Sequence, residues 1–205
     1  MSSFSGGGGD AAAGGVFPTI NTGTLERYVL PGWGFGGVGS GSPSNGRLYY
    51  IPIYVGRTIT YDRIGLDVNT AAPGRSARIG IYNMTRQDSG AIPGTLVLDA
   101  GTVDLSATGV KEINISQELA VGYYYLAYVQ TGGAGVSLEV PASSEAVWTP
   151  VTATRNVVPG PFSGVIQFTS GRGGDVGGGL PTPAPAVDNN SASIAAAYLR
   201  LREVN

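Results

Sequence analysis

Between residues 47 and 140, apolar and polar side chains alternate through a series of short segments separated by turns rich in glycine and proline. A period of two residues is typical of β-strands that bury one face. Proline and glycine favour the tight turns that end such strands. The pattern predicts strands over 47–55, 58–68, 76–82, 95–100, 109–115, 122–130 and 136–140, with a loop over 83–94.

Two of these segments also indicate a position within a sheet. The segment 47–55 contains Pro52, which favours an edge strand or a bulge because proline has no backbone N–H to donate. The segment 122–130 carries large side chains on both faces, which predicts a central strand covered on both sides. In 58–68 the alternation places three apolar side chains on the core face: Ile64, Leu66 and Val68.

Beyond residue 141 the alternation weakens, and we expect further strands at 146–151, 164–170 and 194–204. Alanine and leucine in the last segment also suit a helix, but its alternation favours a strand. Residues 171–191 form a long connection that is glycine-rich and then polyproline-like, and we interpret its first part, GRGGDVGGG (171–179), as a flexible or closely packed loop. Eight or more short strands at this spacing predict an all-β fold, an antiparallel β-sandwich of jelly-roll type.

The first 46 residues differ from this pattern. Residues 1–15 are mostly glycine and alanine, and residues 16–46 carry large apolar side chains with neither a helical nor a strand period. We therefore divide the chain into a glycine-rich N-terminal arm (1–46) and a β-sandwich domain (47–205). The arm either packs along its own domain or reaches a neighbouring subunit, and its candidate anchoring residues are Phe17, Tyr28, Trp33 and Phe35.

Charged residues make up only 13% of the chain, about half the usual ~25%. Since solubility normally depends on charged side chains, we expect much of the surface to be buried against other subunits. The alternative is a surface rich in serine, threonine, asparagine and glycine. The net charge is −2 and the arginines form no cluster, which argues against a nucleic-acid partner.

The chain has no histidine and no cysteine, so it can form neither a Ser-His-Asp triad nor a histidine or thiolate metal site. Among the carboxylates, Asp62, Asp67 and Glu112 lie in predicted strands, where we expect them to face solvent or form ion pairs. The segment GRGGDVGGG lacks the ending of a phosphate-binding loop. We therefore predict no enzyme activity, no catalytic residues, no metal and no cofactor.

Neither a secretory signal nor a membrane-spanning segment is expected, because the N-terminus lacks a basic and an apolar region and no apolar run approaches ~20 residues. Aromatic side chains near loops are the remaining candidates for a binding role. Tyr82 and Trp148 border loops, and a rigid ring with an apolar face could stack on a sugar. The alternative is that both rings belong to the core or to an interface.

Four stretches of the chain follow one another in a recognisable order: ITYDRIGLDV, GRSARIGIYNM, PGTLVLDAGTVDLSATGVKEINI and LAVGYYYLAYV. Together they resemble a β-sandwich module of tailed-bacteriophage virion proteins, of the tail-fibre or appendage type. The resemblance covers about residues 45–140 and, more loosely, the closing AAAYLRLREV. It implies a trimeric, fibre-like or knob-like attachment that faces the host, and it brings no catalytic residues. The short arm differs from the long shaft of a full-length fibre.

The resulting expectation is a virion structural protein, a tail fibre or appendage component that anchors by its arm and projects the sandwich towards the host. Its expected partners are itself, as a homotrimer, other virion proteins, and a host-surface glycan as a candidate ligand. Its expected location is the virion, assembled in the host cytoplasm. The alternatives are a capsid decoration protein, as cement or head fibre, and a lectin-like carbohydrate-binding module.

Overall fold

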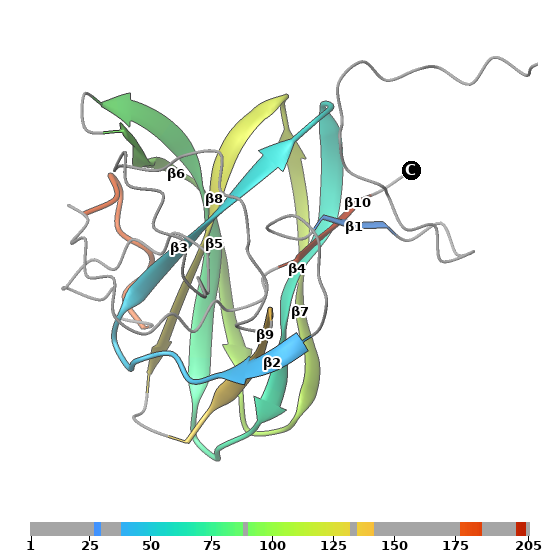
Figure 1. Cartoon of the computed structure of the whole chain (residues 1–205), viewed down its shortest axis with the longest axis vertical. Coiled ribbons are helices and arrows are strands. Elements are labelled where there is room, and N and C mark those ends of the chain that lie inside the picture. The colour runs from blue at the N-terminus through green and yellow to red at the C-terminus, as the bar shows by residue number, and fades with distance from the viewer. Residues whose placement is uncertain are drawn as a thin grey trace, which may run out of the picture.

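The computed structural model describes residues 27–29, 38–87, 90–131, 135–141, 177–185 and 200–203, and these form strands and connecting turns without a helix. The alternation of apolar and polar residues thus gives β-structure throughout the described part of the chain (Figure 1). The strands are β1 (Arg27–Val29), β2 (Val38–Gly41), β3 (Leu48–Val55), β4 (Ile59–Thr70), β5 (Ser76–Gln87), β6 (Gly90–Asp104), β7 (Gly109–Leu119), β8 (Gly122–Thr131), β9 (Ser137–Pro141) and β10 (Arg200–Glu203).

The strands form two antiparallel sheets. Sheet B has the order β3-β8-β5-β6, and in sheet A the long strand β4 pairs with β7 along one edge. The other edge of β4 pairs with β10 near its start and with β9 near its end, and these two strands pair in turn with β1 and β2. This confirms the predicted all-β sandwich, whereas the jelly-roll connectivity stays a prediction.

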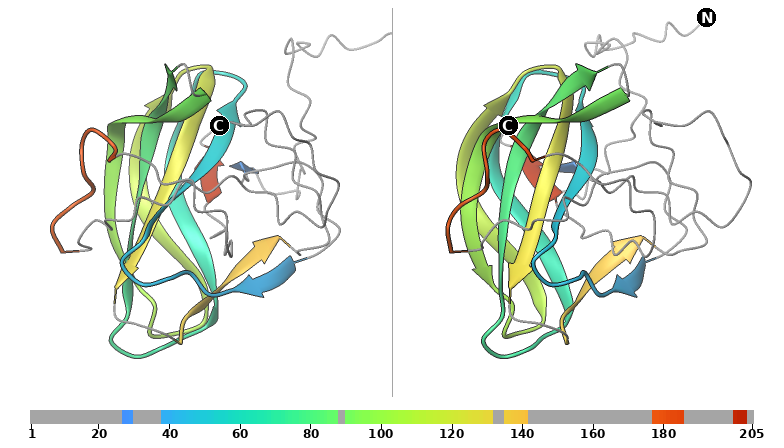
Figure 2. Two further views of the ribbon diagram at one scale, coloured as in Figure 1. Left: turned by 60° about the vertical axis from the view of Figure 1, so that its left-hand side comes forward. Right: turned by 90° about the vertical axis from the view of Figure 1, so that its left-hand side faces the viewer.

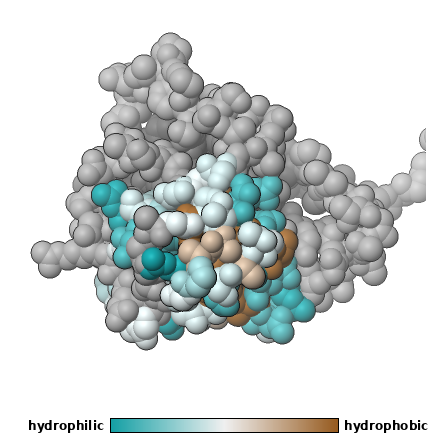
Figure 3. Space-filling model, turned by 90° about the horizontal axis from the view of Figure 1, so that it is seen from below, coloured by the Kyte–Doolittle hydropathy of each residue, from teal (hydrophilic) through white to brown (hydrophobic). Residues whose placement is uncertain are grey.

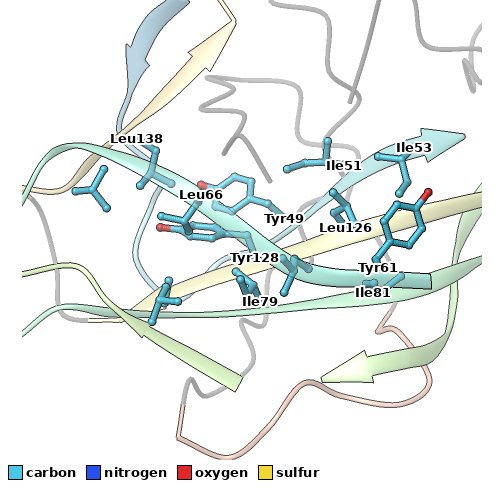
Figure 4. Packing of buried hydrophobic residues seen from close by; sticks show 14 of the residues in the cluster. Tyr49, Ile51, Ile53, Tyr61, Leu66, Ile79, Ile81, Leu126, Tyr128 and Leu138 are labelled. Carbon is cyan, nitrogen blue, oxygen red and sulfur yellow. The ribbon is translucent and has the colours of Figure 1, made fainter. Parts of the chain in front are cut away.

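The core lies between the two sheets and is filled by the side chains that the alternation assigns to the inner faces. Ile64, Leu66 and Val68 are at most 1% exposed, as predicted. They meet side chains from the facing strands of sheet B, such as Ile79 and Leu126 (Figure 4). Burial of this apolar surface is the main favourable contribution to folding, at about 25 cal/mol per Å².

Strand β8 is central and covered on both sides, as predicted from its large side chains. Leu126 and Tyr128 face the main core, and Tyr125 and Val129 face a second apolar cluster on the outside of sheet B. Pro52 lies in β3, an edge strand of sheet B, where a missing N–H breaks no ladder on the outer side. Both predictions about position within a sheet are therefore confirmed.

The prediction of a loop over residues 83–94 is wrong. Strands β5 and β6 continue as one hairpin, paired from Ser76 and Asp104 to Gln87 and Gly90. Pro93 is accommodated because the register shifts between Tyr82 and its neighbours along β5. The predicted strands 146–151 and 164–170 lie outside the described residues, and within 194–204 the described residues form β10.

The described parts of the predicted arm contact the sandwich of their own chain. Strand β1 pairs with β10, and β2 pairs with β9. The side-chain amide of the buried Gln130 donates to the carbonyl of Pro43, and the backbone carbonyl of Gln130 accepts from the N–H of Gly46 at 2.9 Å. The N–H of Ser44 donates to the Tyr49 hydroxyl at 2.7 Å. Residues 38–46 are thus tied to the sandwich by pairing and hydrogen bonds.

At the lower end of the sandwich, two connections between the sheets close over the core. The N–H of Ala72 donates to the carbonyl of Leu105 at 3.1 Å, and the N–H of Leu105 donates to the carbonyl of Arg75 at 2.9 Å. Leu105 itself is fully buried. Seen from below, hydrophilic and hydrophobic residues are interspersed on the described surface (Figure 3).

Candidate functional site on the outer face of sheet B

Five tyrosines gather on the outer face of sheet B, on three adjacent strands. They come from β3, β8 and β5: Tyr50, Tyr54, Tyr123, Tyr125 and Tyr82. The strand register places Tyr54 opposite Tyr123 and Tyr82 opposite Tyr125. Side chains directly opposite each other lie on the same face of a sheet, so these residues form one surface, which we call the tyrosine face.

Three rings of the tyrosine face are buried and pack edge to face. The ring centroids of Tyr50 and Tyr82 are 5.2 Å apart and those of Tyr50 and Tyr125 are 6.3 Å apart, with interplanar angles of 86° and 77°. This is the arrangement that aromatic rings prefer. All three rings are at most 1% exposed. Burial raises the pKa of each phenol above its ordinary value, so these groups stay neutral at physiological pH.

These rings are buried because residues 177–185, which we call the strap, lie along the outside of sheet B (orange-red in Figure 2). Leu180 is 6% exposed and packs in the cluster that contains Tyr50, Tyr82 and Tyr125. The strap passes so close to Gly80 of β5 that a Cβ built on this glycine would lie 2.3 Å from Leu180 Cδ1. Glycine at position 80 is therefore what allows Leu180 to reach the sheet.

Three hydrogen bonds fix the strap to sheet B. The Tyr82 hydroxyl donates to the carbonyl of Pro181 at 2.6 Å. The N–H of Leu180 donates to Asp99 Oδ2 at 3.0 Å, and the N–H of Ala184 donates to the carbonyl of Gly94 at 2.8 Å. Of the segment GRGGDVGGG, the structure describes residues 177–179, which lead into the docked Leu180.

Asp99 connects the strap to the sheet. Its carboxylate accepts hydrogen bonds from the backbone N–H groups of Leu180 and Gly101. Both oxygens also accept a hydrogen bond from Arg78 Nε, at 2.8 and 2.9 Å. Partial burial acts to raise the pKa of Asp99, but the hydrogen bonds from Arg78, Leu180 and Gly101 together lower it below its ordinary value. The carboxylate is therefore held in its charged form.

We expect Asp99→Asn to lower the free energy of unfolding at pH 7 by about 2 kcal/mol, since a charge-assisted network is lost. The folded pKa of Asp99 is lowered, so its contribution is complete above the ordinary carboxyl value of about 4 and is lost as the pH falls through the folded pKa. The measurement is urea unfolding of both proteins from about pH 2.5 to about pH 7, so that Asp99 is protonated at one end of the range and charged at the other.

The difference in stability between wild type and Asp99→Asn should shrink below about pH 4. Asp104 also has a lowered pKa, because of its hydrogen bonds with Ser106, but it is present in both proteins and cancels in the comparison. A difference that is independent of pH would show that the charge of Asp99 does not hold the strap.

The tyrosine face is open at one end. Tyr54 and Tyr123 have ring centroids 4.8 Å apart, and the Tyr123 side chain is 42% exposed. Val121, in the adjacent turn, is 57% exposed. The same row of aromatic side chains thus runs from a buried part under the strap to a half-buried Tyr54 at the end of β3 and an exposed Tyr123 at the start of β8.

The predicted site residues fall in different places. Tyr82, a candidate glycan contact, is fully buried under the strap, so its ring presents no face at the surface. Tyr28 lies in β1, opposite Arg202 of β10. The other candidates, Phe17, Trp33, Phe35 and Trp148, lie outside the described residues. The exposed Tyr123 was missed because the sequence pattern treats all tyrosines of its strand alike.

Asp62, Glu112 and Asp104 make local structural contacts. Arg63 lies 3.7 Å from Asp62 and 4.0 Å from Glu112, in the ion pairing expected for these strand residues. Asp104 accepts the backbone N–H of Ser106 at 2.9 Å, as in a turn. The described residues bring together no group of three potential metal ligands, and they contain no helix that is long and apolar enough to cross a membrane.

Comparison with known proteins adds no assignment to this geometry: no family model, no curated protein and no solved structure matches the chain. A functional conclusion therefore depends on the sequence resemblance and on the arrangement of the described residues.

Proposed function

We propose that this chain is a virion structural protein of a tailed bacteriophage, a tail fibre or appendage component. Its N-terminal arm anchors it in the particle, and its β-sandwich projects towards the host surface as part of a homotrimer. The exposed Tyr123, with the half-buried Tyr54 beside it, is the part of the sandwich that contacts a saccharide of the host. This replaces the buried Tyr82 as the aromatic contact.

The observation that carries this proposal is the separation of β2, the last strand of the arm, from the exposed Tyr123. The last part of the arm joins the sheet through β2, which pairs with β9 beside the end of β4 at Val68 and Thr70. Tyr54 lies just before the turn that leads into the start of β4. At about 3.3 Å per residue, the two ends of β4 are roughly 35 Å apart. The end of the sandwich at β2 can therefore be attached while Tyr123 is presented at the other end, and β1 lies between these ends, beside β10 and the first half of β4.

Several described polar side chains hold neighbouring segments in place, which supports a structural role for the protein. Arg78 with Asp99, Asp104 with Ser106, and Gln130 each stabilise the position of a neighbouring segment. The charge-poor composition and the resemblance to phage modules support self-association, because a surface with few charges is usually buried against a neighbour. A tyrosine ring, with its apolar face and polar hydroxyl, suits contact with a sugar.

The contact assigned to Tyr54 and Tyr123 can be tested with purified, labelled protein on cells of the bacterium that the particle infects. We expect Tyr123→Ala to weaken binding by about tenfold or more, as for an aromatic residue at the centre of a contact. Val110→Ala is the matched control, because Val110 is 48% exposed and pairs with Asp67 at the other end of β4. It should bind like the wild type.

Equal loss of binding in both variants would indicate a general effect on the fold and would contradict the assignment of the contact to Tyr123. Binding that survives Tyr123→Ala and the double variant with Tyr54→Ala would remove the tyrosine pair from the host contact. Competition by free monosaccharides identifies the sugar.

A further inference from the structure

We infer that the strap is a movable cover over a second saccharide subsite on the tyrosine face. The subsite consists of Tyr50, Tyr82 and Asp99, which the strap covers or bonds to in its own chain. This inference deepens the proposed function and rests on the saccharide contact at Tyr123. Tyr125 joins the two places, because it packs on Tyr50 and lies two residues beyond Tyr123 on the same face of β8. A saccharide chain held at Tyr123 would extend into the subsite when the strap lifts.

One polar group beneath the strap is unused in the closed position. The hydroxyl of Tyr50 is buried and makes no hydrogen bond with any described residue, although its ring belongs to the cluster that Leu180 closes. The nearby Tyr82 hydroxyl donates its proton to the carbonyl of Pro181 instead. A buried polar group without a partner is destabilising, and native proteins retain few of them. The Tyr50 hydroxyl therefore indicates a ligand that the closed strap does not replace.

The backbone of the strap occupies the other two groups of the subsite. The N–H of Leu180 donates to Asp99, and the carbonyl of Pro181 accepts from Tyr82. Sugar hydroxyl groups can donate and accept in the same way, since a hydroxyl is both a donor and an acceptor. A saccharide carries further hydroxyl groups and could also bond to Tyr50, which the strap leaves without a partner. This difference favours a saccharide over a proline-rich peptide as the ligand.

The strap is attached by few buried contacts for a segment that covers aromatic rings. Leu180 is the only buried residue of the strap, and its other residues are half-buried or exposed. The strap forms turns and bends and is not a strand of either sheet. Glycines at positions 177–179 give the backbone directly before Leu180 freedom to turn away from the sheet. Segments with few buried apolar contacts open locally while the rest of a protein stays folded. We therefore expect the strap to open on an intact sandwich.

Hydrogen exchange of the full-length protein without ligand tests the opening. The amides of Leu180 and Ala184 are hydrogen-bonded to sheet B. We expect them to exchange at least about a hundredfold faster than those of Leu126 and Ala127 in the central strand β8. Leu180→Ala removes the buried anchor and should speed exchange at Ala184 several-fold again. Strap amides that exchange as slowly as those of β8 would show that the strap opens only when the sandwich unfolds, and would overturn the cover.

Binding measurements test the subsite itself. The probe is polysaccharide extracted from the surface of the bacterium that the particle infects. Leu180→Ala should bind it several-fold more tightly than the wild type, because the strap competes less for the subsite. Tyr50→Phe should bind it several-fold more weakly, yet its stability and strap exchange should match the wild type, since the closed protein loses no hydrogen bond. A purely structural role of the Tyr50 hydroxyl would not give this combination.

The outcomes separate this inference from the proposed function. Unchanged binding in Tyr50→Phe, together with loss of binding in Tyr123→Ala, would overturn the subsite and leave the contact at Tyr123 standing. Leu180→Ala that binds no more tightly than the wild type would show that the strap does not compete with a saccharide. Wild-type protein that binds no polysaccharide would overturn both assignments. A synthetic peptide of residues 177–185 that binds Leu180→Ala in place of the polysaccharide would assign the subsite to a proline-rich segment and contradict the saccharide.

Discussion

Tyr128→Ala is expected to lower the free energy of unfolding by about 4 kcal/mol, the range found when a large buried ring is removed from a core. Tyr128 is fully buried between the sheets, and its ring centroid lies 6.3 Å from that of Tyr49. Its hydroxyl donates to Gln130 Oε1 at 2.6 Å. The alanine variant therefore loses apolar burial and leaves a cavity. It also removes the hydrogen-bond donor to the buried side-chain carbonyl of Gln130.

The consequences should extend to the arm, because the same Gln130 side chain donates to the carbonyl of Pro43. The measurement is equilibrium unfolding in urea, with amide hydrogen exchange at residues 44–46 as a second readout. Tyr123→Ala is the matched control on the same strand, since its ring is 42% exposed, and it should change stability by less than about 1 kcal/mol. Similar losses for the two variants would contradict the assignment of Tyr128 to the core.

The strands and their core faces could be predicted from sequence because the two-residue period is a local signal. Ile64, Leu66 and Val68 are buried where the alternation places them, and the large side chains on both faces of 122–130 correctly indicate a central strand. The β5–β6 hairpin was missed over 83–94, because glycine, proline and polar residues there suggest a loop. Pairing with the neighbouring strand and register shifts keep this region in the sheet.

The strap could not be placed from sequence, because its docking depends on contacts between residues far apart in the chain. Leu180 meets Gly80 and Asp99, and neither a period nor a motif links these positions. The sequence shows a glycine at position 80 and alternating prolines after Leu180. These features indicate a docking site only when the arrangement of the strands is known, because Gly80 then lies beneath Leu180.

The same limit explains the aromatic candidates. Alternation assigns Tyr82 and Tyr123 to the outer face of their sheet, but it does not say which part of that face another segment covers. The strap covers Tyr82 and leaves Tyr123 exposed. The exposed end of the tyrosine face therefore follows from the structure, whereas the number and order of tyrosines follow from the sequence.

The central claim is that the arm holds the sandwich on the tail of a phage particle. Deletion of residues 1–37 tests it, because this removes most of the predicted arm and keeps β2 and the hydrogen-bonded residues 43–46. We expect the truncated protein to fold but to be lost from particles almost completely. Tyr123→Ala, which alters the other end of the sandwich, should be incorporated normally.

The most direct measurement is electron cryomicroscopy of particles that carry the wild-type protein and of particles made with the truncated one. We expect density for the sandwich on the tail of the wild-type particles and its loss in particles made with the truncated protein. Density on the capsid shell, or tail density that survives the deletion, would contradict the central claim.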